Sequence, residues 1–319
     1  MRVAVTGAHG RLGRALIAAL EEAPFVGLSG PTAWGRESFD LDSPGHVTDV
    51  LDRDRPEVVV HAAAWTDVDG CAREPQLAMA RNGTATGTLA EECAARGLDL
   101  IVVSTNEVFD GRRTDGRGYR PTDPPNPINA YGASKLAGEQ AALAAYGPDR
   151  RGAAGGSRAV GGRRSGGALG IVRTAWLFGP PGNDFPAKIL AAAERANAAD
   201  EPLRLVADEI GSPTYSVDLA EAIAELIGGA AIDGVHHLVN DGAVSRADWA
   251  RELLHQAGLV AATEDVPAST WPRVSTPPAW AILEPTPLPG GVPMRSWQAA
   301  LADYLPSLLR QRSAAGSPG

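Results

Sequence analysis

The sequence predicts an α/β protein with a doubly wound parallel sheet and a smaller C-terminal lobe. Two observations carry this prediction. Short apolar, β-rich runs alternate with helical runs through the first half of the chain, which is typical of parallel strands joined by crossover helices. A glycine-rich turn joins the first apolar run to the first helical run. The chain has 319 residues, which is long enough for such a sheet and one added lobe.

The composition excludes several classes of protein. A formal net charge of -9 argues against a surface for nucleic acid or anionic membrane, because such surfaces need basic patches. No apolar run approaches the length of a membrane span. The chain begins with a strand-like run, so we expect no signal peptide and a cytoplasmic protein. Cys71 and Cys93 lack metal-ligand spacing, so we expect buried, reduced cysteines and no metal.

The first βα turn is the predicted phosphate-binding site of a Rossmann-type fold. An apolar run at 2–6 precedes the turn, and a helical run at 14–22 follows it. Gly7 allows the tight turn, Gly10 lets the backbone approach a pyrophosphate, and Gly13 lets the helix pack closely on the strand. The free N–H groups of the helix N-terminus then face the phosphates of a dinucleotide.

Residues 25–29 are predicted to form the second strand. A carboxylate at the end of this strand would accept a hydrogen bond from the 2′-OH of the adenosine ribose and favour NAD. Here the strand leads into Gly30 and Pro31 without an acid, which leaves Arg11 and Arg36 available for a 2′-phosphate. Simple solvation of both arginines is the alternative. The sequence therefore favours NADPH, with NADH as the second choice.

The remaining elements continue the alternation. Apolar runs at 56–64 and 98–104 predict buried parallel strands, and residues 171–173 resume the sheet. Helices are predicted at about 44–52, 76–96, 185–198, 213–227 and 246–257, and a further strand at 235–239. The stretch 275–304 is rich in proline and ends in a short helix, and the tail 312–319 should be frayed.

We expect two interleaved domains. A Rossmann domain covers 1–174, its sheet is completed by residues from about 208–240, and a substrate-binding lobe covers 175–311. Residues 147–168 are rich in Gly, Arg and Ser and have almost no large apolar side chains. They cannot bury enough surface to order themselves, so we expect a flexible insertion with solvated arginines.

Chemistry-bearing residues gather where the predicted strands end. Gly7, Ala63 and Thr105 all fall at carboxyl ends of parallel strands, where the ligands of such sheets bind. Tyr131 and Lys135 follow, four residues apart on one face of a predicted helix. An ammonium group near a phenol favours the phenolate, so this pair could serve the interconversion of a hydroxyl and a ketone. The spacing alone more often marks a surface tyrosine and a solvated lysine.

Together these motifs resemble the extended short-chain dehydrogenase/reductase superfamily, and within it most closely the dTDP-4-dehydrorhamnose reductase family. The similarity extends to about residue 260. The matching stretches are 6–13, 61–69, 104–105, 108–111, 125–139, 172–179, 183–185 and 211–215.

The resemblance implies roles by position. Thr105 should hydrogen-bond the substrate carbonyl, Tyr131 should donate the proton, and Lys135 should hold the nicotinamide ribose and lower the pKa of Tyr131. The implied cofactor-binding residues are Gly7, Gly10, Arg11, Leu12, Gly13, Asp40, Ala62, Ala63, Ala64, Thr66, Asn82, Tyr131 and Lys135. The implied substrate-binding residues are Thr105, Asn106, Glu107 and Trp176. For Asn82 and Trp176, a polar helix residue and a packed aromatic are equal alternatives.

The chain departs from the family at three places, one of which is the insertion at 147–168. Reductases usually have Thr-Asp-Tyr where this chain has Thr105, Asn106 and Glu107, and dehydratases of the same fold usually have Thr-Asp-Glu. Asn106 has no acidic proton, which elimination of water would need. The segment 271–289 also lacks the usual family pattern.

The resemblance therefore implies NAD(P)H-dependent reduction of the 4-keto group of a nucleotide-activated deoxysugar. The alternatives are a dehydratase or epimerase of the same fold and a non-catalytic NAD(P)-binding regulatory subunit. The expected partner is the small-molecule nucleotide sugar, and a homodimer is considered.

Overall fold

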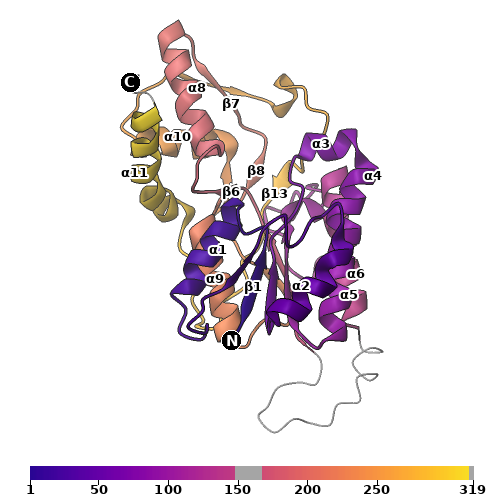
Figure 1. The fold of residues 1–319 in the computed structure, drawn as a ribbon. Coiled ribbons are helices and arrows are strands. Elements are labelled where there is room, and N and C mark those ends of the chain that lie inside the picture. Colours follow the sequence, from indigo (N-terminus) through magenta and orange to yellow (C-terminus); the bar gives the residue numbers. More distant parts are fainter. Residues whose placement is uncertain (148–166, 316–319) are drawn as a thin grey trace.

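The structure is a computed structural model that describes residues 1–147 and 167–315. A parallel sheet lies at its centre (Figure 1). The sheet has six strands in the order β10-β5-β4-β3-β1-β2. The strands are β1 (Val3–Thr6), β2 (Thr32–Trp34), β3 (Val58–His61), β4 (Asp99–Thr105), β5 (Leu169–Thr174) and β10 (Gly234–His237). The direction of winding reverses between β1 and β3, which makes this the switch point where a doubly wound sheet binds its ligand. The predicted fold class is confirmed.

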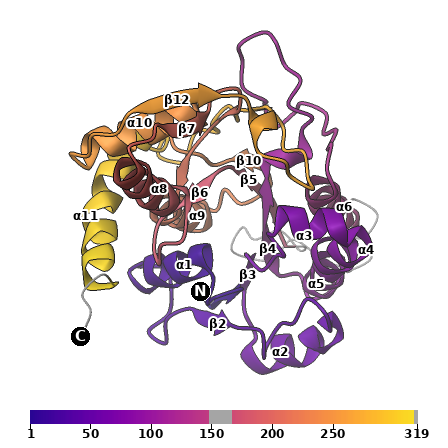
Figure 2. The same cartoon turned by 90° about the horizontal axis from the view of Figure 1, so that it is seen from above.

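Helices cover both faces of the sheet, as Figure 2 shows from above. One face packs against α1 (Arg11–Glu21) and α9 (Ser216–Gly228). The other face packs against α2 (Val47–Asp54), α5 (Ala85–Ala95) and α6 (Ala130–Ala145). The sheet is therefore the middle of three layers in this part of the protein.

The apolar strands are buried on both sides because their side chains alternate between two cores. In β3, Val58 and Val60 join the core beneath α1 and α9, whereas Val59 joins the core beneath α2 and α5. All three are fully buried. Burying each such side chain contributes about 1.5–3 kcal/mol, which explains why these strands are continuous hydrophobic runs.

The predicted helix at 76–96 is present, but it is not uniform. It begins as α4 (Pro75–Ala78), continues as a π-helical segment at Met79–Thr84 and ends as α5. A short helix, α3 (Val68–Arg73), precedes it. The π segment carries Asn82 on its inner side, where it faces α6.

The C-terminal lobe has its own core and three small sheets. Its strands are β6 (Leu177–Phe178), β7 (Leu203–Val206), β8 (Ile210–Gly211), β9 (Thr214–Tyr215), β11 (Val244–Ser245), β12 (Thr263–Val266) and β13 (Trp280–Ala281). Its helices are α8 (Phe185–Ala199), α10 (Arg246–Gln256) and α11 (Trp297–Ala315). Phe178, Trp249 and Tyr304 form the aromatic centre of this core. Single 3-10 turns lie at Pro44–His46, Asn106–Val108 and Ala268–Thr270.

The second strand was predicted in the wrong place. Residues 25–29 form turns, and Leu28 is fully exposed. The strand is β2, where Trp34 is fully buried against α2 and donates to Asp54 at 2.8 Å. Apolar residues at 25–29 resembled a strand, but Phe25 instead packs against Gly228 of α9.

Two further boundaries differ from the prediction. The C-terminal helix is longer than expected, because α11 runs to Ala315 and Arg312 pairs with Glu194 of α8 at 2.6 Å. The tail is therefore helical, not frayed, as far as residue 315. The helix predicted from 213 begins at Ser216, after the short strand β9. Most of the predicted flexible insertion, at 148–166, lies outside the described residues.

Candidate active site

The catalytic candidates converge at the carboxyl edge of the sheet. Thr105 is the last residue of β4, and Tyr131 and Lys135 lie in the first turns of α6. A Cβ atom on Gly132 would lie 2.0 Å from the carbonyl oxygen of Glu107, so only glycine lets α6 pack this closely on the turn after β4. This contact brings Tyr131 into hydrogen-bond contact with Thr105.

Asn129 fixes the start of the catalytic helix. Its side-chain oxygen accepts a hydrogen bond from the Gly132 N–H at 2.8 Å, which is an N-cap. Its amide nitrogen donates to Glu107 Oε2 at 2.7 Å and to the Thr276 carbonyl at 3.1 Å. One side chain therefore joins α6, the turn after β4 and the C-terminal segment.

Lys135 is buried and anchored to the sheet. Its Nζ donates to the Val103 carbonyl of β4 at 2.8 Å, and only 3% of the residue is exposed. Burial lowers the pKa of Lys135 to about 8, although the nearby Glu139 opposes this effect. The lysine is thus held in place beneath Tyr131.

The pKa of Tyr131 shifts in the opposite direction to the one expected. Burial raises this pKa above its usual value and the charge of Glu107 adds to the rise, while the hydrogen bond with Thr105 lowers it. The Lys135 ammonium group donates to the Val103 carbonyl. Tyr131 therefore keeps its proton at neutral pH, which is the form that can protonate a developing alkoxide.

Thr105 and its two neighbours form a compact polar turn. The Thr105 hydroxyl accepts from the Glu107 N–H at 3.2 Å and donates to Asn106 Oδ1 at 3.3 Å. Burial raises the pKa of Glu107, whereas Asn129, Arg246 and Arg273 oppose that rise. The Glu107 carboxyl group is therefore largely removed from water, and it interacts with the Asn129 amide and with the charges of two arginines.

The glycine turn has the close contacts that a phosphate cradle requires. Gly7 has a φ of +65°, and a Cβ there would lie 2.8 Å from the Ala63 backbone. A Cβ on Gly13 would lie 2.1 Å from the Gly7 carbonyl oxygen. The turn and the end of β3 thus meet at the switch point, and backbone N–H groups there are accessible to a dinucleotide. Leu12 is a core residue, so only its backbone can serve a cofactor.

The His61 side chain connects the end of β3 to the end of β1 and to α5. Thr6 Oγ1 lies 2.8 Å from His61 Nδ1 and accepts from the Ala63 N–H at 3.1 Å, and His61 Nε2 lies 3.1 Å from Thr86 Oγ1. Burial, aided by the charge of Lys135, lowers the pKa of His61 to about 3. His61 is therefore neutral and structural. Its position at the end of an apolar strand was the only sequence signal of this role.

The loop after β3 places the other predicted cofactor residues. Ala62, Ala63 and Ala64 are partly exposed at the sheet edge, and Thr66 is exposed. Asn82 is fully engaged within the protein: its side chain accepts from Trp65 N at 2.8 Å and donates to the Trp65 carbonyl and to Ser134 Oγ. This arrangement favours the structural alternative for Asn82, as a clamp between the loop and α6.

Arg11 is not available for a 2′-phosphate, contrary to expectation. Its guanidinium donates to the carbonyls of Gly179 and Gly182 and pairs with Asp184 at 3.0 Å. It therefore joins the glycine turn to the C-terminal lobe. No local sequence pattern indicates this contact, because the partners of Arg11 lie about 170 positions away in the chain.

The end of β2 carries both an arginine and an acid. Arg36 is exposed and pairs with Asp40 at 3.4 Å and with Asp42 at 3.0 Å. A Cβ on Gly35 would lie 2.5 Å from a carboxylate oxygen of Glu37 and 2.7 Å from the His9 ring. Sequence reasoning missed Glu37 because it placed the strand too early.

Trp176 lies in the C-terminal lobe, with one ring face covered. It has a φ of 43°, stacks parallel to Trp249, and has the Arg246 guanidinium 3.6 Å above its ring centroid. Burial lowers the pKa of Arg246 to about 10, and Glu209 lies 3.5 Å from this guanidinium. Arg246 was not predicted, since no local pattern marks it.

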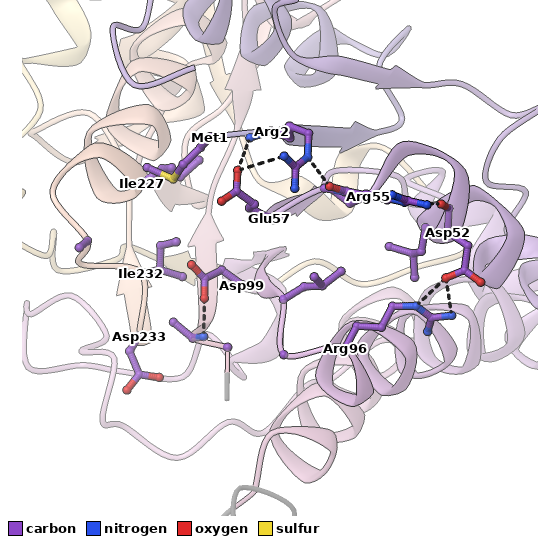
Figure 3. Close-up of a pocket in the computed structure, with 17 residues that line it drawn as sticks. Met1, Arg2, Asp52, Arg55, Glu57, Arg96, Asp99, Ile227, Ile232 and Asp233 are labelled. Atoms are coloured by element: carbon purple, nitrogen blue, oxygen red, sulfur yellow. Dashed lines mark hydrogen bonds and ion pairs between the residues drawn. The ribbon is translucent and has the colours of Figure 1, made fainter. Parts of the chain in front are cut away.

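One cavity in the described part of the chain lies away from this site. A cavity of about 840 Å³ lies at the opposite, amino edge of the sheet (Figure 3). Its charged residues pair with one another, as Arg2 does with Glu57 and Arg96 with Asp52. Gly167 and Ala168, which follow the gap in the described residues, form part of its lining.

Several negative findings apply to the described ranges. Both cysteines are buried and free. No cluster of three or more His, Cys, Asp or Glu side chains within 1–147 and 167–315 is placed to hold a metal ion. Among the helices of those ranges, none combines the length and apolar character that a bilayer span needs.

Comparisons with known proteins agree with this geometry. The chain is 35% identical over 311 residues to a dTDP-4-dehydrorhamnose reductase of Streptomyces griseus, covering 95% of this chain and 93% of that protein. It is 34% identical over 308 residues to a dTDP-4-keto-6-deoxy-D-glucose reductase of Streptomyces niveus, covering 95% and 96%. A solved dTDP-4-dehydrorhamnose reductase of Bacillus anthracis, in complex with NADP, superposes with a TM-score of 0.79 at 29% identity, covering 96% and 99%. The family model described as the RmlD substrate binding domain matches residues 1–310, and the chain therefore belongs to that family.

Proposed function

We propose that this chain reduces the 4-keto group of a dTDP-linked deoxysugar with NADPH, as in the conversion of dTDP-4-dehydrorhamnose to dTDP-rhamnose. The main observation in favour of this proposal is that Thr105, Tyr131 and Lys135 lie together at the carboxyl edge of the sheet, beside the glycine turn. Relatives at about 35% identity are named as reductases of this kind, and a solved relative holds NADP. The chain is accordingly an NAD(P)H-dependent sugar-nucleotide ketoreductase.

The residues fit a bound dinucleotide. The turn at Gly7 and Gly13 leaves no room for side chains, so a pyrophosphate there would meet backbone N–H groups and the α1 N-terminus. Lys135, fixed by Val103, would hold the nicotinamide ribose. When bound, the cofactor supplies the hydride.

The protein supplies position and a proton. Thr105 can donate a hydrogen bond to the substrate carbonyl, because its hydroxyl is free to rotate away from Asn106, a contact of 3.3 Å. Tyr131 then gives its proton to the oxygen as the carbon is reduced. Its raised pKa in the free protein keeps that proton in place until negative charge develops nearby.

Elimination of water is disfavoured by the same site. Asn106 can hydrogen-bond a sugar hydroxyl through its amide, but it has no acidic proton. Glu107, which dehydratases use as a base, is here hydrogen-bonded to Asn129 at 2.7 Å. A dehydratase or epimerase activity is the second candidate, and this Glu107 is the observation in its favour.

The decisive experiment is a substitution of the proton donor. Tyr131→Phe should lower turnover of a dTDP-linked 4-keto-6-deoxyhexose by roughly two to four orders of magnitude, with NADPH binding retained. Tyr146→Phe is the matched control, because it removes a phenol hydroxyl at the far end of the same helix, where that hydroxyl donates to Leu98. Near wild-type turnover by the Tyr131 variant would remove this residue from the mechanism.

A second assay separates the two candidate activities. The protein is incubated with dTDP-glucose and NAD, and the 4-keto-6-deoxy product is measured. We expect none at catalytic rates. Its appearance would replace the reductase assignment with a dehydratase and make Glu107 the base.

The domain division, the oligomeric state and the cellular location of the protein are further parts of this proposal. The division into a Rossmann domain at 1–174 and an interleaved lobe at 175–311 is a proposal that limited proteolysis can test. A homodimer and a cytoplasmic location also stay predictions. Light scattering at micromolar protein tests the first, and cell fractionation tests the second.

A further inference from the structure

Arg11 connects the glycine turn to the C-terminal lobe. It is the first residue of α1 and follows Gly10 directly, so its backbone N–H is among those that would face a bound pyrophosphate. Its guanidinium group makes three hydrogen bonds with the loop at 179–184, which joins β6 to α8. The main chain of this residue therefore belongs to the proposed cofactor site, and its side chain contacts the proposed substrate lobe.

The acceptors of Arg11 are themselves held within the loop. Arg11 Nη1 donates to the Gly179 carbonyl at 2.8 Å and to Asp184 Oδ2 at 3.0 Å, and Nη2 donates to the Gly182 carbonyl at 3.0 Å. The Asp184 side chain is 1% exposed, accepts from the Gly179 N–H and caps α8 through the Ala187 N–H. The planar fork of a guanidinium group suits several fixed acceptors of this kind. Arg11 therefore pairs with the buried carboxylate at which α8 begins.

The conformation of the loop depends on such contacts. Gly179 and Gly182 have φ values of 129° and 98°, and Asn183 has a φ of 59°. A residue other than glycine in the left-handed region is unfavourable by itself and persists where the surrounding contacts hold it. Arg11 holds the loop on both sides of Asn183, through Gly182 and Asp184. Loss of the Arg11 guanidinium should therefore let the loop leave this conformation.

Both ends of the loop lead to the Arg246 guanidinium group. Trp176, which precedes β6, has this group 3.6 Å from its ring centroid, and Phe185, which follows the loop directly, has it at 5.2 Å. Both rings stack on Trp249. Arg246 in turn acts electrostatically on Glu107, in the polar turn after β4. The conformation of the loop therefore sets where the charge of Arg246 lies relative to that turn.

We propose that Arg11 is a positioning residue that couples the cofactor site to the substrate site. A bound dinucleotide orders the glycine turn and with it Arg11, which holds the loop at 179–184 and hence Trp176 and Arg246 in their places. The second ligand then meets a site that is already ordered, so each ligand tightens the binding of the other. This inference rests on the proposed function and adds how the two ligands influence each other.

The test measures a coupling ratio, which is the Kd of NADP⁺ without dTDP divided by its Kd at saturating dTDP. Both values come from isothermal titration of the full chain and require no turnover. Wild type should give a ratio of about five or more, which is the lower end of ordinary coupling between sites. Arg11→Met keeps an unbranched side chain but removes the guanidinium group, so its ratio should fall to between about one and two. Because the ratio is taken within one protein, a uniform loss of cofactor affinity does not change it.

Arg14→Met is the matched control. Arg14 lies in the first turn of the same helix, is exposed, and donates to the His9 carbonyl within the glycine turn at 2.9 Å. This variant loses the same charge from the same helix and should keep the wild-type ratio within about 1.5-fold. If Arg11→Met does not fold, Arg11→Lys provides the test. It keeps a positive charge beside Asp184 but has no fork to reach both carbonyls, so the ratio should fall by about half or more.

Two outcomes would overturn the inference: a wild-type ratio of about one, or a wild-type ratio in a folded Arg11 variant. The failure of the proposed function would look different, because it would appear in which ligands bind or in turnover. If wild type binds UDP in place of dTDP, or NAD⁺ in place of NADP⁺, the ratio is measured with that ligand and only the ligand assignment fails. Reduction of the keto-sugar is measured separately, by NADPH oxidation.

Discussion

Asn129 is the side chain whose substitution tests the site most directly. It caps α6 through Gly132 and also donates to Glu107 Oε2 at 2.7 Å. Asn129→Ser keeps a capping oxygen but is too short to reach Glu107, whereas Asn129→Ala removes both contacts. The pair of variants therefore separates the cap from the bond to the carboxylate.

The free energy that each of these two contacts contributes can be stated to an order of magnitude. A lost N-cap costs about 1 kcal/mol, so Asn129→Ala should be that much less stable than Asn129→Ser. A hydrogen bond to a charged, buried carboxylate contributes about 1.5–3 kcal/mol, so Asn129→Ser should already be less stable than wild type by that amount at neutral pH. In a protein of this size, 1 kcal/mol corresponds to roughly 2 °C in melting temperature.

The pH dependence identifies Glu107 as the partner. Burial raises the pKa of Glu107, so the group costs stability as pH rises through its folded value. Loss of the Asn129 donor raises the pKa of Glu107 further, so the loss of stability continues to a higher pH. The melting temperature of Asn129→Ser should therefore fall furthest below wild type near pH 7 and approach it as the pH falls through the raised pKa of Glu107, where the carboxyl group becomes protonated. A difference that is independent of pH would refute the assignment of the Asn129–Glu107 bond.

Two other predictions concern the buried lysine and the cofactor. Because the pKa of Lys135 is lowered to about 8, the unfolded chain binds more protons above that pH. Between about pH 8 and pH 9.5, wild type should gain up to about 2 kcal/mol of stability relative to Lys135→Met, as measured by urea unfolding of both proteins at both pH values. Arg36→Ala should lower kcat/KM with NADPH by about tenfold and leave NADH within about twofold, if Arg36 meets the 2′-phosphate. Equal losses with both cofactors would assign Arg36 to its ion pair with Asp42 instead.

The sequence predicted those parts of the fold that depend on local pattern. The strand at Val58–His61 and the glycine turn after Thr6 follow from continuous apolar runs and from a backbone that has no room for side chains. The placement of Tyr131 and Lys135 on one helix followed from their spacing. These features need few contacts with distant residues, so a pattern of residue types is enough to predict them.

The features that depend on contacts between residues far apart in the sequence were not predicted. The pKa of Tyr131 is raised by its burial and by the charge of Glu107, and the spacing of Tyr131 and Lys135 indicates neither effect. Arg11 was expected to meet phosphate, but partners in the C-terminal lobe bind it. Arg246 becomes important only because the fold lays it on Trp176, about 70 positions earlier in the chain. No local pattern encodes any of these contacts.

Two of the places where the sequence departs from its family, positions 106–107 and segment 271–289, lie close together, and their charges interact. Glu107 replaces the usual tyrosine, and a buried carboxylate without partners would be costly. Burial raises its pKa, and Asn129, Arg246 and Arg273 oppose that rise; Arg273 belongs to the divergent segment 271–289. The same segment supplies the Thr276 carbonyl that accepts from Asn129. If tyrosine replaced Glu107 and nothing else changed, Glu209 would be the one carboxylate left beside Arg246 and Arg273. The negative charge of Glu107 and the positive charge of Arg273 therefore balance each other, and the two departures from the family depend on one another.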